Sequence, residues 1–183
     1  TAIYKGGNIM GDLVLRYNKV AFMGVPASGG STVTYTRMHG FTSMSLSRSA
    51  QTYDRKYIDR KSNDVDTIGY SPSMSFGFDE LRDDAVCTDL AAIIDNEKVG
   101  TDAVRSIVVV DFTKTAADGK YKAYERKWSV VPDSEGDGTD AYTYSGSFNS
   151  KSEIVWGTAA IATPSGGDNE TAETITFTAD SGE

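Results

Sequence analysis

The 183-residue sequence contains one cysteine, one histidine and four prolines. Because Cys87 is alone, the chain forms no internal disulfide, which excludes a disulfide-held scaffold. His39 is also alone and precedes Gly40, whereas most catalytic triads and histidine-ligated metal sites need a histidine with partner side chains. No apolar run approaches the roughly 18–20 residues that a membrane-spanning helix needs. We therefore expect His39 in a turn or on the surface, and no membrane association.

The charge is unevenly distributed along the chain, whose net charge is −8. Residues 1–70 hold nine basic and five acidic residues, a balance of +4, whereas residues 71–183 hold nine basic and 21 acidic residues, a balance of −12. The acidic balance argues against a protein that grips nucleic acid, because attraction to phosphate requires clustered Lys and Arg. The amino terminus shows no basic leader followed by an apolar segment, so we expect synthesis inside the cell.

The inventory of chemically active groups is small. The acidic loop at residues 132–140 resembles part of a calcium-binding EF-hand loop, but strands rather than helices are expected on both sides, which favours a solvated turn. Cys87 is expected as a small buried or half-buried helix residue, without a neighbouring cation to activate its thiol. No pair of carboxylates is set apart as an acid and a base. We therefore expect no catalytic residues, no metal ligands and no cofactor, and a protein that is not an enzyme.

Alternating apolar and polar residues predict a chain built mostly of β-strands. In residues 71–79, for example, Met74, Phe76 and Phe78 alternate with Ser73, Ser75 and Gly77, as in a half-buried antiparallel strand. The expected strands are residues 19–25, 31–37, 41–48, 71–79, 105–112, 121–131, 142–148, 154–162 and 174–178.

One segment follows a helical period instead. Between residues 83 and 98, the apolar side chains of Val86, Leu90, Ile93 and Ile94 recur at helical spacing. Asp83 or Asp84 is suited to cap the start, and Lys98 followed by Gly100 is expected to mark the end. The sequence thus predicts a mostly β fold, a sandwich or barrel-like set of sheets with one flanking α-helix. We expect a single domain over residues 1–183, with an amino-terminal extension of about residues 1–18.

Residues 51–70 form the most unusual segment, because they are long and charged and have almost nothing to bury. Four aspartates are balanced by four basic residues, and several tyrosines and isoleucines are interspersed. A structureless connection of this length is uncommon inside a compact domain. We interpret it as an arm that orders against a neighbouring subunit; an ordinary solvated hairpin is the alternative. The candidate inter-subunit contacts are Tyr53, Arg55, Tyr57, Asp59, Arg60 and Lys61.

Several segments of the sequence resemble a known protein family. Five segments carry the resemblance: VAFMGVPASGG (residues 20–30), YTRMHGFTSMSLSRSAQTYDRKYID (35–59), GYSPSMSFGFD (69–79), RSIVVVDF (105–112) and YTYSGSFNSKSEIVWGTA (142–159). They resemble the major tail tube protein of long-tailed, siphovirus-type bacteriophages. The resemblance runs from about residue 19 to residue 178. It lies in the overall residue pattern and in the order of the expected elements rather than in a short motif.

The resemblance implies a virion protein, made in the cytoplasm of a host bacterium, whose copies form hexameric rings that stack into a hollow tail tube. It implies that the arm at residues 51–70 reaches adjacent subunits. The implied partners are the tape measure protein, the tail terminator or head-completion proteins and the tail-tip proteins. DNA would pass through the lumen without specific binding, and an acidic interior would repel its phosphates.

Two other classes of protein remain open from the sequence. One is another oligomeric virion component, such as a head-decoration or tail-terminator protein. The other is a β-sandwich that binds carbohydrate or a cell surface, in which Trp128, Trp156 and the ten tyrosines would form a platform for sugars.

Overall fold

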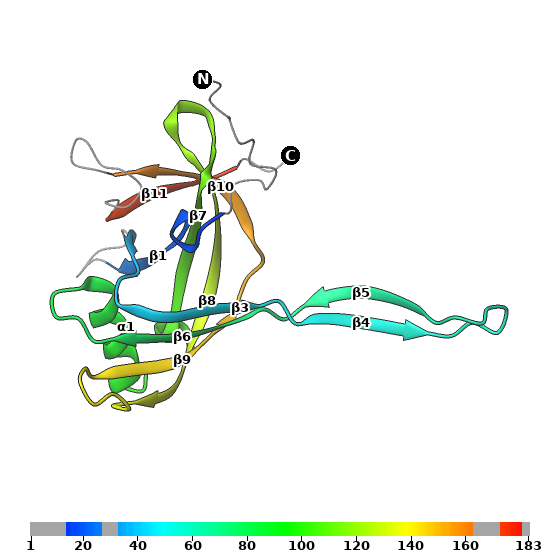
Figure 1. Ribbon diagram of the computed structural model, residues 1–183, viewed down its shortest axis with the longest axis horizontal. Coiled ribbons are helices and arrows are strands. Elements are labelled where there is room, and N and C mark those ends of the chain that lie inside the picture. The colour runs from blue at the N-terminus through cyan, green and yellow to red at the C-terminus, as the bar shows by residue number, and fades with distance from the viewer. Residues whose placement is uncertain (1–13, 27–32, 163–172, 181–183) are drawn as a thin grey trace, which may run out of the picture.

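Six strands close into a barrel in the computed structural model, which describes residues 14–26, 33–162 and 173–180 (Figure 1). The strands are β1 (Lys19–Pro26), β2 (Val33–Arg37), β7 (Val104–Thr115), β8 (Tyr121–Glu135), β10 (Val155–Ile161) and β11 (Thr174–Ala179). They pair in the order β10-β11-β2-β1-β7-β8, and β8 pairs again with β10 to complete the ring. The mostly β fold class expected from the sequence is confirmed.

The interior of the barrel is filled by apolar side chains from alternate positions of its strands. Val20 and Phe22 of β1 and Val108 and Val110 of β7 point inward, where they pack around Ala159 of β10. The next residues along β1, Ala21 and Met23, belong to a second core on the outside of the barrel. This division follows from the period of two in a strand, which sends neighbouring side chains to opposite faces.

The second core lies between the barrel and a further sheet. Strand β8 extends beyond the barrel and pairs with β9 (Thr143–Ser150), which is followed by β6 (Ser73–Asp79) and β3 (Phe41–Ser47). The inner face of this extension carries Phe76, Phe78, Tyr144 and Phe148, whose rings contact one another. These rings share one core with Leu90 and other residues of the helix α1 (Ala85–Asp95).

Helix α1 begins where the sequence predicts and ends earlier. The carboxylate of Asp84 caps the start by accepting a hydrogen bond of 2.8 Å from the backbone N–H of Cys87. The helix ends at Asp95, and Glu97 turns the chain with a φ of 48°. The expected end at Lys98 and Gly100 is therefore wrong, because Gly100 opens the short 3-10 helix η2 (Gly100–Ala103) instead.

A bidentate ion pair joins α1 to the barrel. The Arg105 guanidinium at the start of β7 donates hydrogen bonds of 2.6 and 2.8 Å to the two carboxylate oxygens of Asp89 on the helix. It also donates to the backbone carbonyls of Asp102 and Val104. Both side chains are largely shielded from solvent, so the contact holds the helix in place with charge-assisted hydrogen bonds.

The strands β4 (Ala50–Arg55) and β5 (Asp64–Tyr70) form a separate two-stranded hairpin that projects far from the rest of the molecule (Figure 1). This hairpin continues the β3–β6 pair, and the two parts meet where Ser71 donates its backbone N–H to the carbonyl of Ser49. Residues 51–70 are thus a hairpin of two paired strands joined by a loop at residues 56–63, rather than a structureless connection. We call residues 50–70 the arm.

Other boundaries differ from those expected by a few residues. Strand β8 continues through Glu135, so the acidic loop begins at about Gly136 rather than at residue 132. The remaining short elements are the 3-10 helices η1 (Arg16–Asn18) and η3 (Ala117–Gly119). In the described part of the chain, no helix is long and apolar enough to cross a membrane. Most of the expected extension over residues 1–18, and residues 31 and 32 of an expected strand, lie outside the described residues.

Candidate assembly surfaces

Cross-strand pairing organises the side chains of the arm. Tyr53 lies opposite Asp66, and Arg55 lies opposite Asp64, so these four side chains share one face of the hairpin. The Arg55 guanidinium donates a hydrogen bond of 2.6 Å to the Tyr53 hydroxyl. Closer to the tip, Arg60 forms an ion pair of 2.8 Å with Asp64. The structure therefore connects three of the six candidate contact residues, Tyr53, Arg55 and Arg60, within the arm.

The tip of the arm, residues 56–61, combines cations with exposed apolar side chains. Lys56, Arg60 and Lys61 outnumber the single acidic residue Asp59. Ile58 is 109% exposed, as free of contacts as in an extended peptide. Its exposure is unfavourable for an isolated apolar side chain, so the tip has the composition of a surface that binds something else. Ile58 was not among the candidate contacts from the sequence, which singled out the tyrosines and charges around it.

A second surface is the outward face of the sheet β3-β6-β9. Three rows of aligned residues cross it: Ser45, Ser75 and Ser147; Ser43, Gly77 and Ser145; and Ser47, Ser73 and Asn149. None of these nine positions carries a charge. We call them the serine face. The alternation of serine with apolar residues is visible in the sequence, but the alignment of the rows across strands appears only in the fold.

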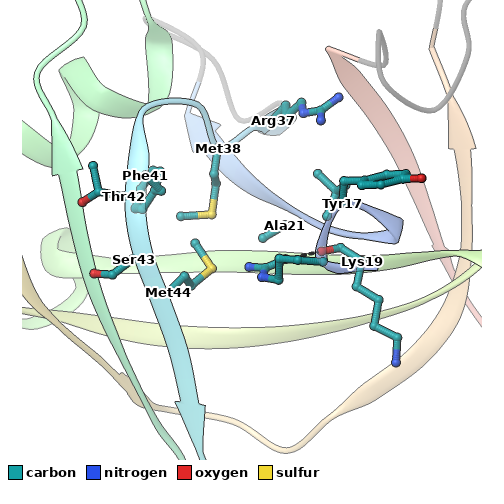
Figure 2. A pocket seen from close by; sticks show the side chains of 11 residues that line it. Tyr17, Lys19, Ala21, Arg37, Met38, Phe41, Thr42, Ser43 and Met44 are labelled. Carbon is teal, nitrogen blue, oxygen red and sulfur yellow. Dashed lines mark hydrogen bonds between the residues drawn. The ribbon is translucent and has the colours of Figure 1, made fainter. Parts of the chain in front are cut away.

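The outer edge of β3 borders a groove with an apolar floor (Figure 2). Met38, Phe41 and Met44 lie together on one side of this groove, opposite Tyr17 and Ala21. The basic residues Arg16, Lys19 and Arg37 complete its lining. Within the described residues, the edge of β3 that faces away from β6 pairs with no other strand, so its backbone groups are available for pairing.

An acidic groove lies between the end of α1 and the end of β8. In Figure 1, α1 is on the opposite side of the body from the arm. Its apolar lining is Ile94, Val99 and Pro132, and its acidic lining is Glu97, Asp133 and Glu135. The acidic surroundings continue around Tyr142, where partial burial and the nearby carboxylates of Glu135, Asp95 and Glu80 raise the pKa of the hydroxyl.

The two residues with the most reactive side chains, His39 and Cys87, meet at a backbone group: the Cys87 thiol donates a hydrogen bond of 3.5 Å to the carbonyl oxygen of His39. The His39 ring is partly exposed, as expected, and lies 2.7 Å from the carboxylate of Glu173. Cys87 is fully buried, and this burial raises the pKa of its thiol to about 12. Among the described residues, no group of three or more His, Cys, Asp or Glu side chains is arranged to hold a metal ion.

The two tryptophans do not form the common platform considered for a sugar-binding protein. Trp128 belongs to the second core and is 3% exposed, whereas Trp156 is 60% exposed on β10, where its ring packs against Tyr124. Trp128 is therefore a core residue. Its ring is not available to a carbohydrate, which leaves Trp156 as the one exposed indole of the two.

The fold has a counterpart among solved structures. A chain from the tail of an empty GTA particle with C6 symmetry superposes with a TM-score of 0.52 at 12% identity. The match covers 78% of this chain and 97% of that chain. The two chains share a fold. No model of a known protein family matches the sequence, and no curated protein sequence matches it either.

Two further structures resemble the chain more weakly. A chain of the tube-terminating cap of the anti-feeding prophage has a TM-score of 0.49 at 10% identity, over 86% of this chain and 99% of that chain. A chain of the anti-feeding prophage baseplate has a TM-score of 0.45 at 5% identity, over 80% of this chain and 97% of that chain.

Proposed function

We propose that this protein is a structural component of the tail of a bacteriophage or a phage-like particle, and that it assembles into hexameric rings stacked as a hollow tube. The observation that carries the proposal is the arm, whose strands pair as a hairpin although nearly all of their residues are exposed. The shared fold with a chain from a C6-symmetric tail supports six-fold symmetry. The residue-level resemblance to tail tube proteins points the same way.

The arm fits a role in contact between subunits. A lone two-stranded hairpin is marginally stable in water at best, so the arm requires a further surface to hold it in place. Its Tyr53, Tyr57 and Ile58 provide contact area, and its Arg55, Asp59, Arg60 and Lys61 provide orientation through charge. These residues are the proposed inter-subunit contacts.

The serine face suits the wall of a channel for DNA. Many weak Lys or Arg contacts to phosphate, summed along a tube, would hold the DNA and impede its passage. An uncharged hydroxyl surface makes no such contacts, and it serves the same end as the acidic interior expected from the net charge. We assign the serine face to the lumen, where DNA passes without specific binding.

Further partners follow from the resemblance to tail tube proteins. The tube would enclose a tape measure protein before DNA passes, and would end at tail-terminator or head-completion proteins and at tail-tip proteins. The function in this scheme is structural rather than catalytic, and its location is the tail of the virion.

Electron microscopy of the purified protein tests the assembly directly. The expected result is long hollow tubes whose end views and helical averages show six subunits in each ring. Closed single rings would point to a decoration or terminator protein. Monodisperse particles over a wide range of concentration and salt would overturn the proposal in favour of a binding module.

The channel wall has its own test. Tubes of the Ser45→Lys/Ser75→Lys variant are assembled in the presence of short duplex DNA and pelleted. Lysines in the lumen should retain DNA that a nuclease cannot reach, and the retention should fall with salt. Thr176→Lys, on the exposed outer side of the barrel, is the matched control and should retain only DNA that the nuclease degrades. Nuclease-sensitive DNA on both variants would place the serine face outside the tube.

A further inference from the structure

The two ends of the molecule are complementary in chemistry. The arm tip, residues 56–61, carries three cations and one carboxylate around the fully exposed Ile58. The acidic groove at the far end carries three carboxylates around an apolar lining, with Lys98 as its one cation. The arm tip is thus an apolar residue surrounded by positive charge, and the acidic groove is an apolar surface surrounded by negative charge.

The arm cannot place its tip in the groove of its own chain. Figure 1 shows the arm extending away from the body, with α1 and the start of β9 on the opposite side. At ~3.3 Å per residue, strand β4 (Ala50–Arg55) by itself carries the chain roughly 17 Å beyond the sheet, and the tip lies beyond its end. The groove that the tip can enter therefore belongs to another molecule.

We propose that the arm tip of one copy docks into the acidic groove of the next copy, with Ile58 against Ile94, Val99 and Pro132. Lys56, Arg60 and Lys61 then face Glu97, Asp133 and Glu135. The contact is heterologous, because two different surfaces of the same chain meet, and it leaves a free tip at one end and a free groove at the other. Copies joined in this way form a chain, which closes into a ring or continues as a filament according to the rotation between neighbours. This inference rests on the proposed function, since it names the surface that receives the arm in the assembly.

Both parts of the contact contribute to its specificity. Charge complementarity orients the approaching tip toward carboxylates and away from the basic groove beside β3, whose charged lining residues are all basic. Burial of Ile58 adds apolar contact that salt does not screen. Assembly should therefore slow as salt rises, while assembled material dissociates less readily than a purely ionic contact would.

Engineered cysteines test this docking without requiring that tubes form. Ile58 and Val99 are both highly exposed, at 109% and 80%, so Ile58→Cys and Val99→Cys leave the folded core intact. The native Cys87 is fully buried and stays out of the reaction. Under mild oxidation, the double variant should give a ladder of disulfide-linked multimers in a non-reducing gel. The matched control is Ile58→Cys/Thr42→Cys, whose second cysteine lies in the basic groove and should give no ladder.

The outcomes separate this inference from the proposed function. A ladder from the Val99 pair supports the docking whether or not tubes are seen, and its occurrence without tubes would count against the tube alone. Tubes without a ladder from the Val99 pair would overturn the docking and leave the tube standing. A ladder from the Thr42 pair alone would also overturn it, by showing that the arm enters the other groove.

A charge exchange provides a second readout. Arg60→Glu/Lys61→Glu on the tip, or Asp133→Lys/Glu135→Lys in the groove, should each reduce assembly at least tenfold at low salt. All four changes in one chain again give the tip and the groove opposite charges, and this variant should recover most of the assembly. Failure of the combined variant to recover, in a protein whose circular dichroism shows it folded, would contradict the proposed pairing.

Discussion

The body and the arm of this protein use the same kinds of residue in opposite ways. In the body, the large apolar side chains fill two cores, and Phe22, Phe78 and Phe148 are fully buried. In the arm, Ile58, Val65 and Ile68 are largely exposed although the backbone forms a paired hairpin. The positions of core residues are determined by contacts within one chain. Those of the arm residues are not, and in the proposed assembly a second molecule supplies the missing contacts.

The ion pairs of the two regions differ in the same way. The side chains of Arg105 and Asp89 in the body are 10% and 16% exposed, and they form two hydrogen bonds to each other. Those of Arg60 and Asp64 in the arm are 58% and 40% exposed and form one. Removing one partner of a shielded, bidentate pair leaves a charge without its counter-charge and is costly, whereas an exposed pair contributes little to stability and remains available to a partner.

Removing the arm should produce the largest difference between the two regions, because it should abolish assembly and leave the stability of the body unchanged. Replacement of residues 54–66 by a short Gly-Ser turn keeps the pairs Ala50–Tyr70, Gln51–Gly69 and Thr52–Thr67 at the base. We expect a folded monomer with an unchanged melting temperature and no assembly, measured by circular dichroism and sedimentation. Normal tubes from the shortened chain would show that the arm is not an assembly element.

A pair of apolar truncations should separate stability from assembly. Leu90→Ala removes a fully buried side chain from the second core and should cost about 2–5 kcal/mol of unfolding free energy. Ile58→Ala removes the exposed side chain at the arm tip and should change the stability of the monomer by less than about 0.5 kcal/mol. Denaturant titration measures both. Equal effects on unfolding would mean that the two regions are not distinct.

Neutralising one acid in each ion pair should give the smallest difference. Asp89→Asn leaves the shielded Arg105 guanidinium without its counter-charge and should cost about 2 kcal/mol. Asp64→Asn in the arm should cost less than about 0.5 kcal/mol, because solvent screens that pair. Melting curves of the two monomeric variants compare their losses of stability. A larger loss of stability from Asp64→Asn than from Asp89→Asn would contradict the expected order.

The strands and the helix could be predicted from the sequence because their signals are local. The alternation of Met74, Phe76 and Phe78 with small polar residues, and the capping residue Asp84, act within a few positions of each other. Closure of the barrel could not be predicted in the same way. It depends on pairing such as Trp156 with Tyr124, between residues far apart in the chain whose side chains carry no signal for one partner over another.

The two halves of the proposed contact differ in how readily the sequence reveals them. The arm is continuous in sequence, and its lack of anything to bury is visible in composition alone; a hairpin is the alternative considered for it, and the structure shows that hairpin. The acidic groove joins Glu97 and Val99 after the helix to Asp133 and Glu135 on β8, and only the fold brings these together. The early end of α1 helps to form it, since Glu97 turns the chain where a longer helix was expected.

Hydrogen exchange of the arm before and after assembly tests the central claim most directly. In the monomer, the backbone amides of Tyr53, Asp66 and their neighbours in β4 and β5 should exchange much faster than those of β1 and β7 in the barrel. In the assembled protein, the account predicts at least a tenfold slowing over residues 50–70, with little change in the barrel core. Equally fast exchange of the arm in both states would contradict it, because an arm that binds a neighbouring copy must become protected.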